Sequence, residues 1–347
     1  MSLTFSVTNS CNSRCKTCNI WQLYPEKPEK KTEELKLWEF EKTFASLGKS
    51  IFWATLSGGE PFLRADLSEI CEALVETCRP SIVNIPTNSL LPETIEKKTQ
   101  EILEMCRDVS VIVNLSLDGV GQTHDGIRGV PGNFERFLDT YERLNKLRAK
   151  FPSLHLGVHS VVSKFSIGEI FEAYEFAKTL KADSYITEVA EQRTELFTVD
   201  KDIAPTAEEY DRFVVEITRR TKRDRFSGKN SLSRFTQAFR LMYYQLAAEE
   251  LRVRKQVIPC YAGWASGQVS AYGDVWPCCV LGYGHSMGNL RDCDYDFRKV
   301  WSSEAAEKIR RSIKAGECAC PLANAHYTNI LCNPRATLKV LGNILRA

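Results

Sequence analysis

Apolar and polar residues follow two alternating patterns over the first half of the chain. Short, mostly apolar stretches predict buried strands, and longer stretches whose apolar residues recur every three or four positions predict amphipathic helices. The strands are expected at 3–8, 51–56, 82–86, 111–117, 155–160 and 184–189. The helices are expected at 35–47, 65–77, 93–106, 133–150 and 167–180. Strands that alternate with helices in this way predict βαβ units with right-handed crossovers, and therefore a parallel sheet.

Chemically reactive residue types gather where these expected strands end. They occupy 58–60, 87–88, 116–119 and 187–188. Because ligands of parallel α/β sheets bind at the carboxyl ends of the strands, we expect these segments to share one site.

The pattern changes after the sixth expected strand. Residues 205–256 are polar and helical, and their basic run 219–225 is interpreted as a solvated helix face. Short strands then follow at 267–271 and 275–277, with a helix at about 297–314. We therefore expect three parts: an α/β unit over 1–204, a helical and basic connecting segment over 205–256, and a small α+β domain over 257–347.

The composition is that of a globular protein with many cysteines. Its 46 basic and 44 acidic residues give a formal charge of +2, which predicts no nucleic-acid partner. The sequence shows neither an export signal nor an apolar stretch long enough to span a membrane, so we expect a cytoplasmic protein. In that compartment the 13 cysteines indicate metal or redox chemistry, and a secreted disulfide scaffold is excluded.

The cysteines fall into three classes. Cys71, Cys78 and Cys106 sit in apolar helical contexts, where cysteine packs as a small hydrophobe. Three more lie close together near the N-terminus: Cys11, Cys15 and Cys18. The last quarter of the chain holds the other seven: Cys260, Cys278, Cys279, Cys293, Cys318, Cys320 and Cys332.

The N-terminal three cysteines fit an iron–sulfur cube better than zinc. Zinc takes four tetrahedral ligands, and the nearest further candidates, Cys71 and His124, are distant in the sequence. Three thiolates on a short loop suit a [4Fe–4S] cluster with one iron left open for another ligand. Zinc with a distant fourth ligand stays an alternative.

The spacing of these cysteines, followed by Ser-Gly-Gly-Glu-Pro at 57–61, resembles the radical S-adenosylmethionine (radical SAM) enzymes. The segments 116–119, 124–125, 128–129 and 132–134 resemble the subgroup with a C-terminal SPASM or twitch domain. The resemblance implies a partial (β/α)6 barrel over 1–204 and an iron–sulfur SPASM/twitch-like domain over 257–347.

The resemblance also implies roles for individual residues. Cys11, Cys15 and Cys18 would hold a [4Fe–4S] cluster whose open iron chelates S-adenosylmethionine. The amine of S-adenosylmethionine would contact Gly58, Gly59 and Glu60. Its carboxylate or ribose would contact Ser116, Arg128 and Asn88. Its adenine would lie against the backbone of Ile20. The glycines would let backbone approach the ligand closely. His124 and His159 are interpreted as ordinary polar or core histidines.

The C-terminal cysteines match the opening of the SPASM pattern and then depart from it. Cys260, Gly273 and Cys278 have the expected spacing, but the later cysteine block is incomplete. We therefore expect one auxiliary [4Fe–4S] cluster, with Cys279 and Cys293 as non-ligands. Its four ligands would come from Cys260, Cys278, Cys318, Cys320 and Cys332. A zinc ribbon is the competing interpretation, and the cysteine count permits either full ligation or an open site.

These features predict an enzyme that cleaves S-adenosylmethionine to a 5′-deoxyadenosyl radical, which abstracts hydrogen from an unactivated carbon. We expect an oxidative modification of a small molecule, such as a sugar or a nucleotide- or lipid-linked compound. A peptide-modifying maturase is the alternative, and a non-enzymatic zinc-binding adaptor is a remote one. The expected electron donor is a flavodoxin or ferredoxin. The amphipathic tail 335–346 is interpreted as packed on its own domain rather than on a membrane surface.

Overall fold

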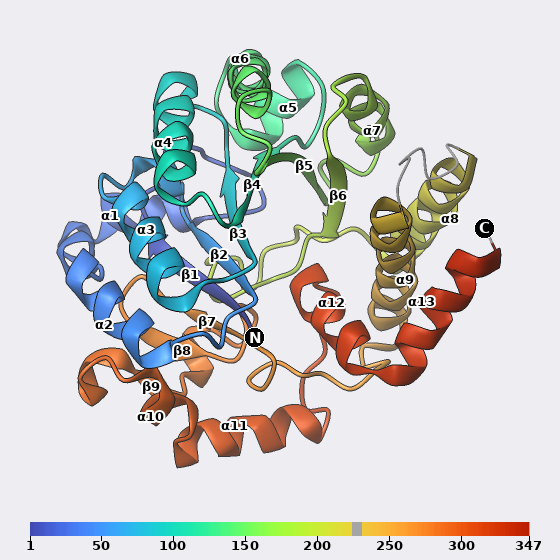
Figure 1. Cartoon of the computed structure of the whole chain (residues 1–347). Helices are drawn as coiled ribbons and strands as arrows, with labels where there is room; N and C mark the ends of the chain where they lie inside the picture. The colour runs from blue at the N-terminus through green and yellow to red at the C-terminus, as the bar shows by residue number, and fades with distance from the viewer. Residues whose placement is uncertain (224–230, 347) are drawn as a thin grey trace.

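The computed structural model describes residues 1–223 and 231–346 and is built around one nine-stranded sheet, in the order β6-β5-β4-β3-β2-β1-β7-β8-β9. Its first six strands are all parallel and run in chain order across the sheet (Figure 1). They are β1 (Ser2–Thr8), β2 (Trp53–Gly58), β3 (Ile82–Thr87), β4 (Ser110–Ser116), β5 (Leu154–Val162) and β6 (Ser184–Val189). All six expected strands are present, and the parallel α/β architecture is confirmed.

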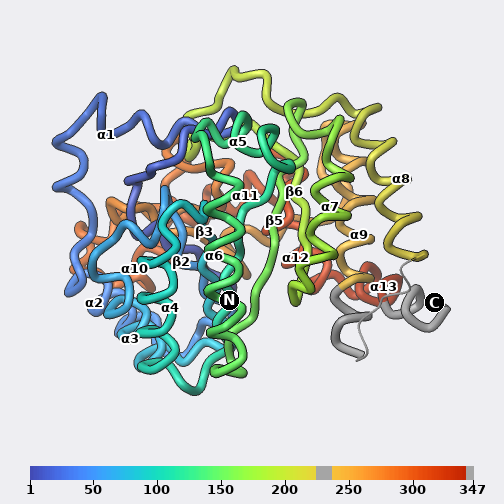
Figure 2. Tube along the Cα trace, turned by 90° about the horizontal axis from the view of Figure 1, so that it is seen from above, coloured from blue at the N-terminus to red at the C-terminus, as the bar shows by residue number. Residues whose placement is uncertain are grey.

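Helices cover the outer face of this sheet, as Figure 2 shows from above. The five expected helices are α2 (Leu37–Leu47), α3 (Leu67–Cys78), α4 (Pro92–Met105), α6 (Asn133–Arg148) and α7 (Ile170–Thr179). Two short helices, α1 (Leu23–Glu26) and α5 (Gln122–Arg128), were not expected. Leu3, Phe5 and Val7 alternate along β1 and are fully buried in the core beneath these helices. Alternation therefore turns the residues between them to the inner face of the sheet.

The inner face of the sheet is polar. Thr55 of β2, Asn84 of β3 and Asn114 of β4 lie on it, as alternation with the buried apolar positions requires. The Asn114 amide donates to Asn84 Oδ1 at 2.6 Å, and the Asn84 amide donates to Thr55 Oγ1 at 3.3 Å. Gly157 on β5 leaves room for this row, because a Cβ there would overlap Asn114. The strands thus enclose a hydrophilic lumen.

The C-terminal strands continue the same sheet instead of forming another. β7 (Ser266–Val269) pairs in parallel with β1, and β8 (Asp274–Trp276) and β9 (Gly288–Asn289) follow antiparallel. The single helix expected at 297–314 is two helices, α10 (Phe297–Trp301) and α11 (Glu304–Lys314). Ser303 separates them because its Oγ accepts a hydrogen bond from the backbone N–H of Ala306 and caps α11.

A second hydrophobic cluster forms beside β6. It joins α8 (Ala207–Arg223), α9 (Ser231–Val253), α12 (Ala323–Cys332) and α13 (Pro334–Arg346), which gather together in Figure 1. Helix α13 packs against α9 and α12, as the interpretation of the tail requires. In the basic run, Arg219 and Arg220 pair with Glu216 on α8, and residues 224 and 225 lie outside the described residues. Within the described parts of the chain, every helix is too short or too polar to cross a lipid bilayer.

Candidate active site

The three N-terminal cysteines lie on one loop that leaves the carboxyl end of β1. Cys18 interacts electrostatically with Cys11 and Cys15, so the three thiols face a common region. Burial raises the pKa of Cys11 to about 12 and the pKa of Cys18 still further. Such thiols are protonated at neutral pH and become thiolates when a metal displaces the proton. The donor set therefore suits an iron–sulfur group.

This cysteine loop is fastened to the end of α5. The backbone N–H of Arg14 and the hydroxyl of Ser13 both donate to the carbonyl oxygen of Arg128, each at 3.0 Å. The hydroxyl of Ser13 also lies 3.2 Å from Cys15 Sγ. Gly129 makes the approach possible, because it has φ +69° and a Cβ there would overlap the carbonyl oxygen of Arg14. The loop is thus held by backbone contacts before any group binds.

The two glycines after β2 serve the same loop. The N–H of Gly59 donates to Thr8 O at 2.7 Å, and the N–H of Glu60 donates to Ser10 O at 2.7 Å. A Cβ on Gly58 would overlap the Thr8 carbonyl, and a Cβ on Gly59 would overlap that of Ser10. The close approach that requires these glycines is therefore to the cysteine loop, whereas the sequence suggested an approach to the ligand. Their contact with the S-adenosylmethionine amine stays a prediction.

Glu60 is buried and points toward the end of β3. Its Oε1 accepts from Thr87 Oγ1 at 3.0 Å and from Phe62 N at 3.2 Å, and its Oε2 accepts from Asn88 N at 2.7 Å. Burial raises the pKa of Glu60 to about 7, against the effect of these hydrogen bonds and of Arg128. Its carboxylate therefore positions the β3 loop, and direct contact with S-adenosylmethionine stays a prediction.

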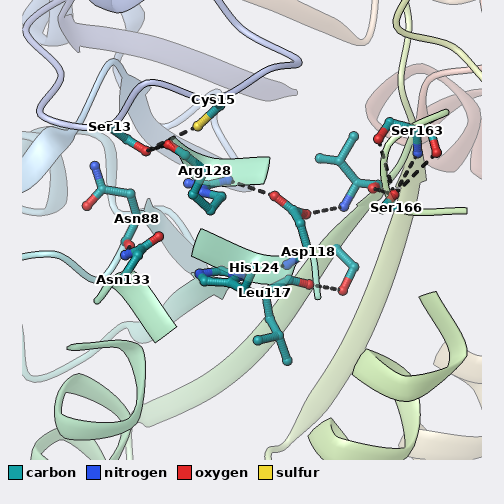
Figure 3. A network of polar contacts seen from close by, with 12 residues as sticks. Ser13, Cys15, Asn88, Leu117, Asp118, His124, Arg128, Asn133, Ser163 and Ser166 are labelled. Carbon is teal, nitrogen blue, oxygen red and sulfur yellow. Dashed lines mark hydrogen bonds and ion pairs between the residues drawn. The ribbon is translucent and has the colours of Figure 1, made fainter. Parts of the chain in front are cut away.

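Arg128 and Asp118 form a buried ion pair at the carboxyl end of β4. Arg128 Nη1 donates to Asp118 Oδ2 at 3.0 Å, and Asp118 Oδ1 accepts from Val161 N at 2.7 Å (Figure 3). Arg128 Nε is buried without a partner among the described residues, so this donor is available to a ligand. His124 accepts from Asp118 N at 3.1 Å, and burial lowers its pKa to about 4. It is a neutral core histidine, as interpreted.

The remaining predicted contacts surround the same region. Asn88 donates to Asn12 Oδ1 at 2.7 Å and lies 3.9 Å from Cys11 Sγ, at the edge of the cysteine loop. Ile20, two residues after Cys18, is buried and donates its backbone N–H to that thiol. Ser116 ends β4 on the inner face. The structure therefore brings the predicted cofactor contacts to one end of the barrel.

Four of the five C-terminal ligand candidates surround one cavity. Cys260, Cys278, Cys318 and Cys320 line it together, although up to 60 residues separate them. Gln256 supports this arrangement by donating to the carbonyl oxygen of Cys318 at 2.9 Å. Four thiols are the full ligand set of a [4Fe–4S] cluster.

The fifth candidate lies elsewhere. Cys332 ends α12, is not among the residues that line this cavity, and interacts with the N-terminal amine of Met1. Cys279 is buried, with Arg193 Nη1 3.7 Å from its Sγ, and Cys293 lies in the turn before α10. Neither of the latter two lines this cavity, although Cys279 lines a neighbouring one together with Cys278 and Cys320. That Cys279 and Cys293 are non-ligands stays a prediction.

The spacing of the metal-ligating side chains is wide. Within residues 1–223 and 231–346, no three His, Cys, Asp or Glu side chains converge closely enough to hold one metal ion. A cube distributes its thiolates over four irons and therefore spaces them more widely than a zinc ion does.

The sequence placed Glu188 at the expected site but did not indicate two charged residues that lie near it. Arg193 and Glu195 follow β6, and Glu195 interacts electrostatically with both Cys18 and Cys279. Glu188 is the last residue but one of β6, and its Oε2 lies 3.8 Å from His159 Nε2. Burial lowers the pKa of His159. The position of Glu188 at a strand end was the one local signal. The contact between Arg193 and Cys279 joins residues 86 apart and had no signal.

Comparison with known proteins matches two family models. Residues 5–177 match the radical SAM superfamily, and residues 260–321 match the SPASM iron–sulfur cluster-binding domain. The chain is 31% identical to the AdoMet-dependent heme synthase of Methanosarcina barkeri (strain Fusaro / DSM 804), over 89% of this chain and 84% of that protein. It is 24% identical to the subtilosin biosynthesis protein AlbA of Bacillus subtilis (strain 168), over 87% of this chain but 61% of AlbA.

A solved structure shares the fold. The structure of native anSMEcpe with bound AdoMet and Cp18Cys peptide superposes with a TM-score of 0.63 at 15% sequence identity, covering 99% of both chains. The radical SAM domain implies S-adenosylmethionine and a [4Fe–4S] cluster, and the SPASM domain implies auxiliary iron–sulfur clusters. A zinc-binding adaptor is thereby excluded. The chain belongs to the radical SAM superfamily, as an enzyme with a C-terminal SPASM domain.

Proposed function

We propose that this enzyme oxidises a polar small molecule after hydrogen abstraction. Cys11, Cys15 and Cys18 would hold the first cluster, and Cys260, Cys278, Cys318 and Cys320 the auxiliary one. When bound, these groups and S-adenosylmethionine supply a 5′-deoxyadenosyl radical and an acceptor for the electron left on the substrate.

The observation that carries the oxidative assignment is the cavity lined by four cysteines. Four protein thiolates complete the ligand set of a cube and leave no iron for the substrate, so electron transfer is the role that fits. Cys332, the fifth candidate, is not needed for this count.

The lumen supports the substrate class. Its strands present hydroxyl, amide and carboxylate groups inward, including Thr55, Asn84, Asn114 and Glu188. A site built from hydrogen-bonding groups rejects an apolar ligand, because the buried polar groups would lose partners. The heme synthase relative, aligned over most of both chains, also favours a small molecule.

The peptide maturase alternative rests on AlbA, whose similarity covers most of this chain. The small-molecule and peptide hypotheses differ in the compound that should stimulate cleavage of S-adenosylmethionine. A flavodoxin or ferredoxin is the expected source of the first electron in both.

The test uses the anaerobically reconstituted enzyme with dithionite. Sugars, nucleotide-linked sugars, tetrapyrroles and cysteine-containing peptides are compared for stimulated formation of 5′-deoxyadenosine, and the product mass is measured. We expect a small molecule to lose two hydrogen atoms. Cys278→Ala should abolish this product while sparing cleavage of S-adenosylmethionine, and the control Cys332→Ala should keep both. A product of unchanged mass, or full product from Cys278→Ala, would overturn the oxidative assignment.

A further inference from the structure

The segment after β6 carries a charged group into the lumen on a fixed backbone. Asn19, next to Cys18, donates its backbone N–H to Leu196 O and its side-chain amide to Phe197 O, both at 2.9 Å. A turn closed by Thr198 holds Arg193, because Arg193 N donates to Thr198 Oγ1 at 3.0 Å and Thr198 N donates to Arg193 O at 3.1 Å. The position of Arg193 is therefore set by the same region that carries the first cysteine loop.

The Arg193 guanidinium pairs with a carboxylate only at the limit of ion-pair distance. Its Nη1 lies 3.7 Å from the Cys279 sulfur, a weak acceptor, and 4.0 Å from Glu195 Oε2. Its Nε is buried without a partner among the described residues. Glu195 in turn accepts a hydrogen bond from the Gln268 side chain, so Arg193 shares this carboxylate with another donor. A guanidinium carries five N–H donors in a planar fork suited to carboxylate or phosphate, and most of this fork is unused.

A buried acceptor accompanies this arginine. Glu188 is 8% exposed, and its Oε1 has no hydrogen-bond partner in the part of the chain that the structure describes. Its other oxygen lies 3.8 Å from His159 Nε2. Arg193 and Glu188 interact electrostatically, yet no ion pair within 4.0 Å joins them among the described residues. The lumen therefore offers an unfilled anion site and an unfilled acceptor near each other.

Resting on the proposed function, we propose that Arg193 and Glu188 form the substrate site, and that the substrate is an anion that also carries hydroxyl or amino groups. Arg193 would take the carboxylate or phosphate in its fork, and Glu188 Oε1 would accept from an O–H or N–H of the same molecule. Sugar acids and sugar phosphates share this chemistry. Both residues would therefore bind the substrate directly, at the carboxyl end of the barrel lumen.

The test is calorimetric titration of the anaerobic holoenzyme with candidate substrates. S-adenosylmethionine is present at saturation, so that Arg128 is already occupied by the cofactor. The probes are glucose 6-phosphate, glucuronate, inorganic phosphate and glucose. We expect at least one of the two anionic sugars to bind at millimolar concentration or below, and glucose to bind more weakly. The preferred anionic sugar then shows whether phosphate or carboxylate is the natural group.

The variants separate the two residues. Arg193→Gln should weaken the anionic sugar at least about tenfold. Arg193→Lys keeps the charge but loses the planar fork, so it should give an intermediate loss of affinity. This variant also tests the site if Arg193→Gln fails to fold. The matched control Arg148→Gln, an arginine that pairs with Asp183 away from the lumen, should bind as the wild type does. Glu188→Gln should weaken the anionic sugar relative to inorganic phosphate.

Equal binding of the anionic sugar by wild type and both Arg193 variants would overturn the site. Failure of both anionic sugars to bind, or glucose binding as tightly as they do, would overturn the substrate class. Because binding is measured without turnover, a failure of the oxidation assays would leave a positive titration valid, and the two proposals can fail separately.

Discussion

Replacing Asp118 by Asn should destabilise the protein and weaken binding of S-adenosylmethionine, although the two side chains have nearly the same shape. Asp118 Oδ2 accepts from Arg128 Nη1 at 3.0 Å and Oδ1 accepts from Val161 N at 2.7 Å, and the two side chains of the ion pair are 1% and 10% exposed. An amide in that position must turn its NH2 toward one of these two donors. Removing one charge of a buried pair typically costs about 3–5 kcal/mol, because the other charge stays buried without compensation.

That loss is large beside a total folding stability of about 5–15 kcal/mol. Thermal unfolding of the cluster-loaded protein should therefore show a midpoint several degrees below wild type, and calorimetry should show weaker binding of S-adenosylmethionine, because Arg128 loses the contact that orients it. The control is Glu93→Gln, which breaks an ion pair with Arg143 whose side chains are 76% and 31% exposed. Exposed pairs contribute about 0–1 kcal/mol, so its midpoint should barely move. Equal midpoints for Asp118→Asn and Glu93→Gln would refute the reasoning.

Two further changes test the loop contacts. Gly59→Ala places a Cβ against the carbonyl oxygen of Ser10 and should displace the cysteine loop. Iron analysis should then show about half the iron content of the wild type, which corresponds to one cube of two. The control Gly126→Ala, whose Cβ meets nothing within 4 Å, should keep the iron content of the wild type. Because burial raises the pKa of Glu60 to about 7, the folded protein holds a proton that the unfolded chain releases above about pH 4.5. This carboxyl therefore makes stability fall as pH rises from about 4.5 to 7, and Glu60→Gln should remove that part of the slope in thermal unfolding measured across this range; an unchanged slope would contradict it.

Local signals in the sequence were enough to predict the parallel sheet and its helices. Alternating apolar residues such as Leu3, Phe5 and Val7 are recognised from neighbouring positions, and so are the strand ends where the predicted ligand-binding residues lie. The break at Ser303 was missed because a capping serine in a polar stretch resembles an ordinary helical residue until its hydrogen bond to Ala306 is seen.

Contacts between distant segments could not be predicted in the same way. The pairing of β7 with β1 joins residues more than 250 positions apart, and no local pattern specifies it. The same holds for Arg193 and Cys279, whose proximity depends on that pairing. That four of the five candidate cysteines line one cavity also needed the fold, since Cys332 has the same chemistry but lies on α12 near Met1.

The antiparallel turn from β7 to β8 determines where the second set of cysteines can act. If the C-terminal segment had continued as parallel strands, both cysteine sets would follow strand ends at the same edge of the sheet. Because β8 runs backward, Cys278 and Cys320 instead reach a cavity lined by Ser2 and Thr4, at the opposite end of β1 from the first cysteine loop. The polar lumen then lies between the two sets. In the oxidation that we propose, hydrogen would be removed on one side of the substrate and the electron withdrawn on the other.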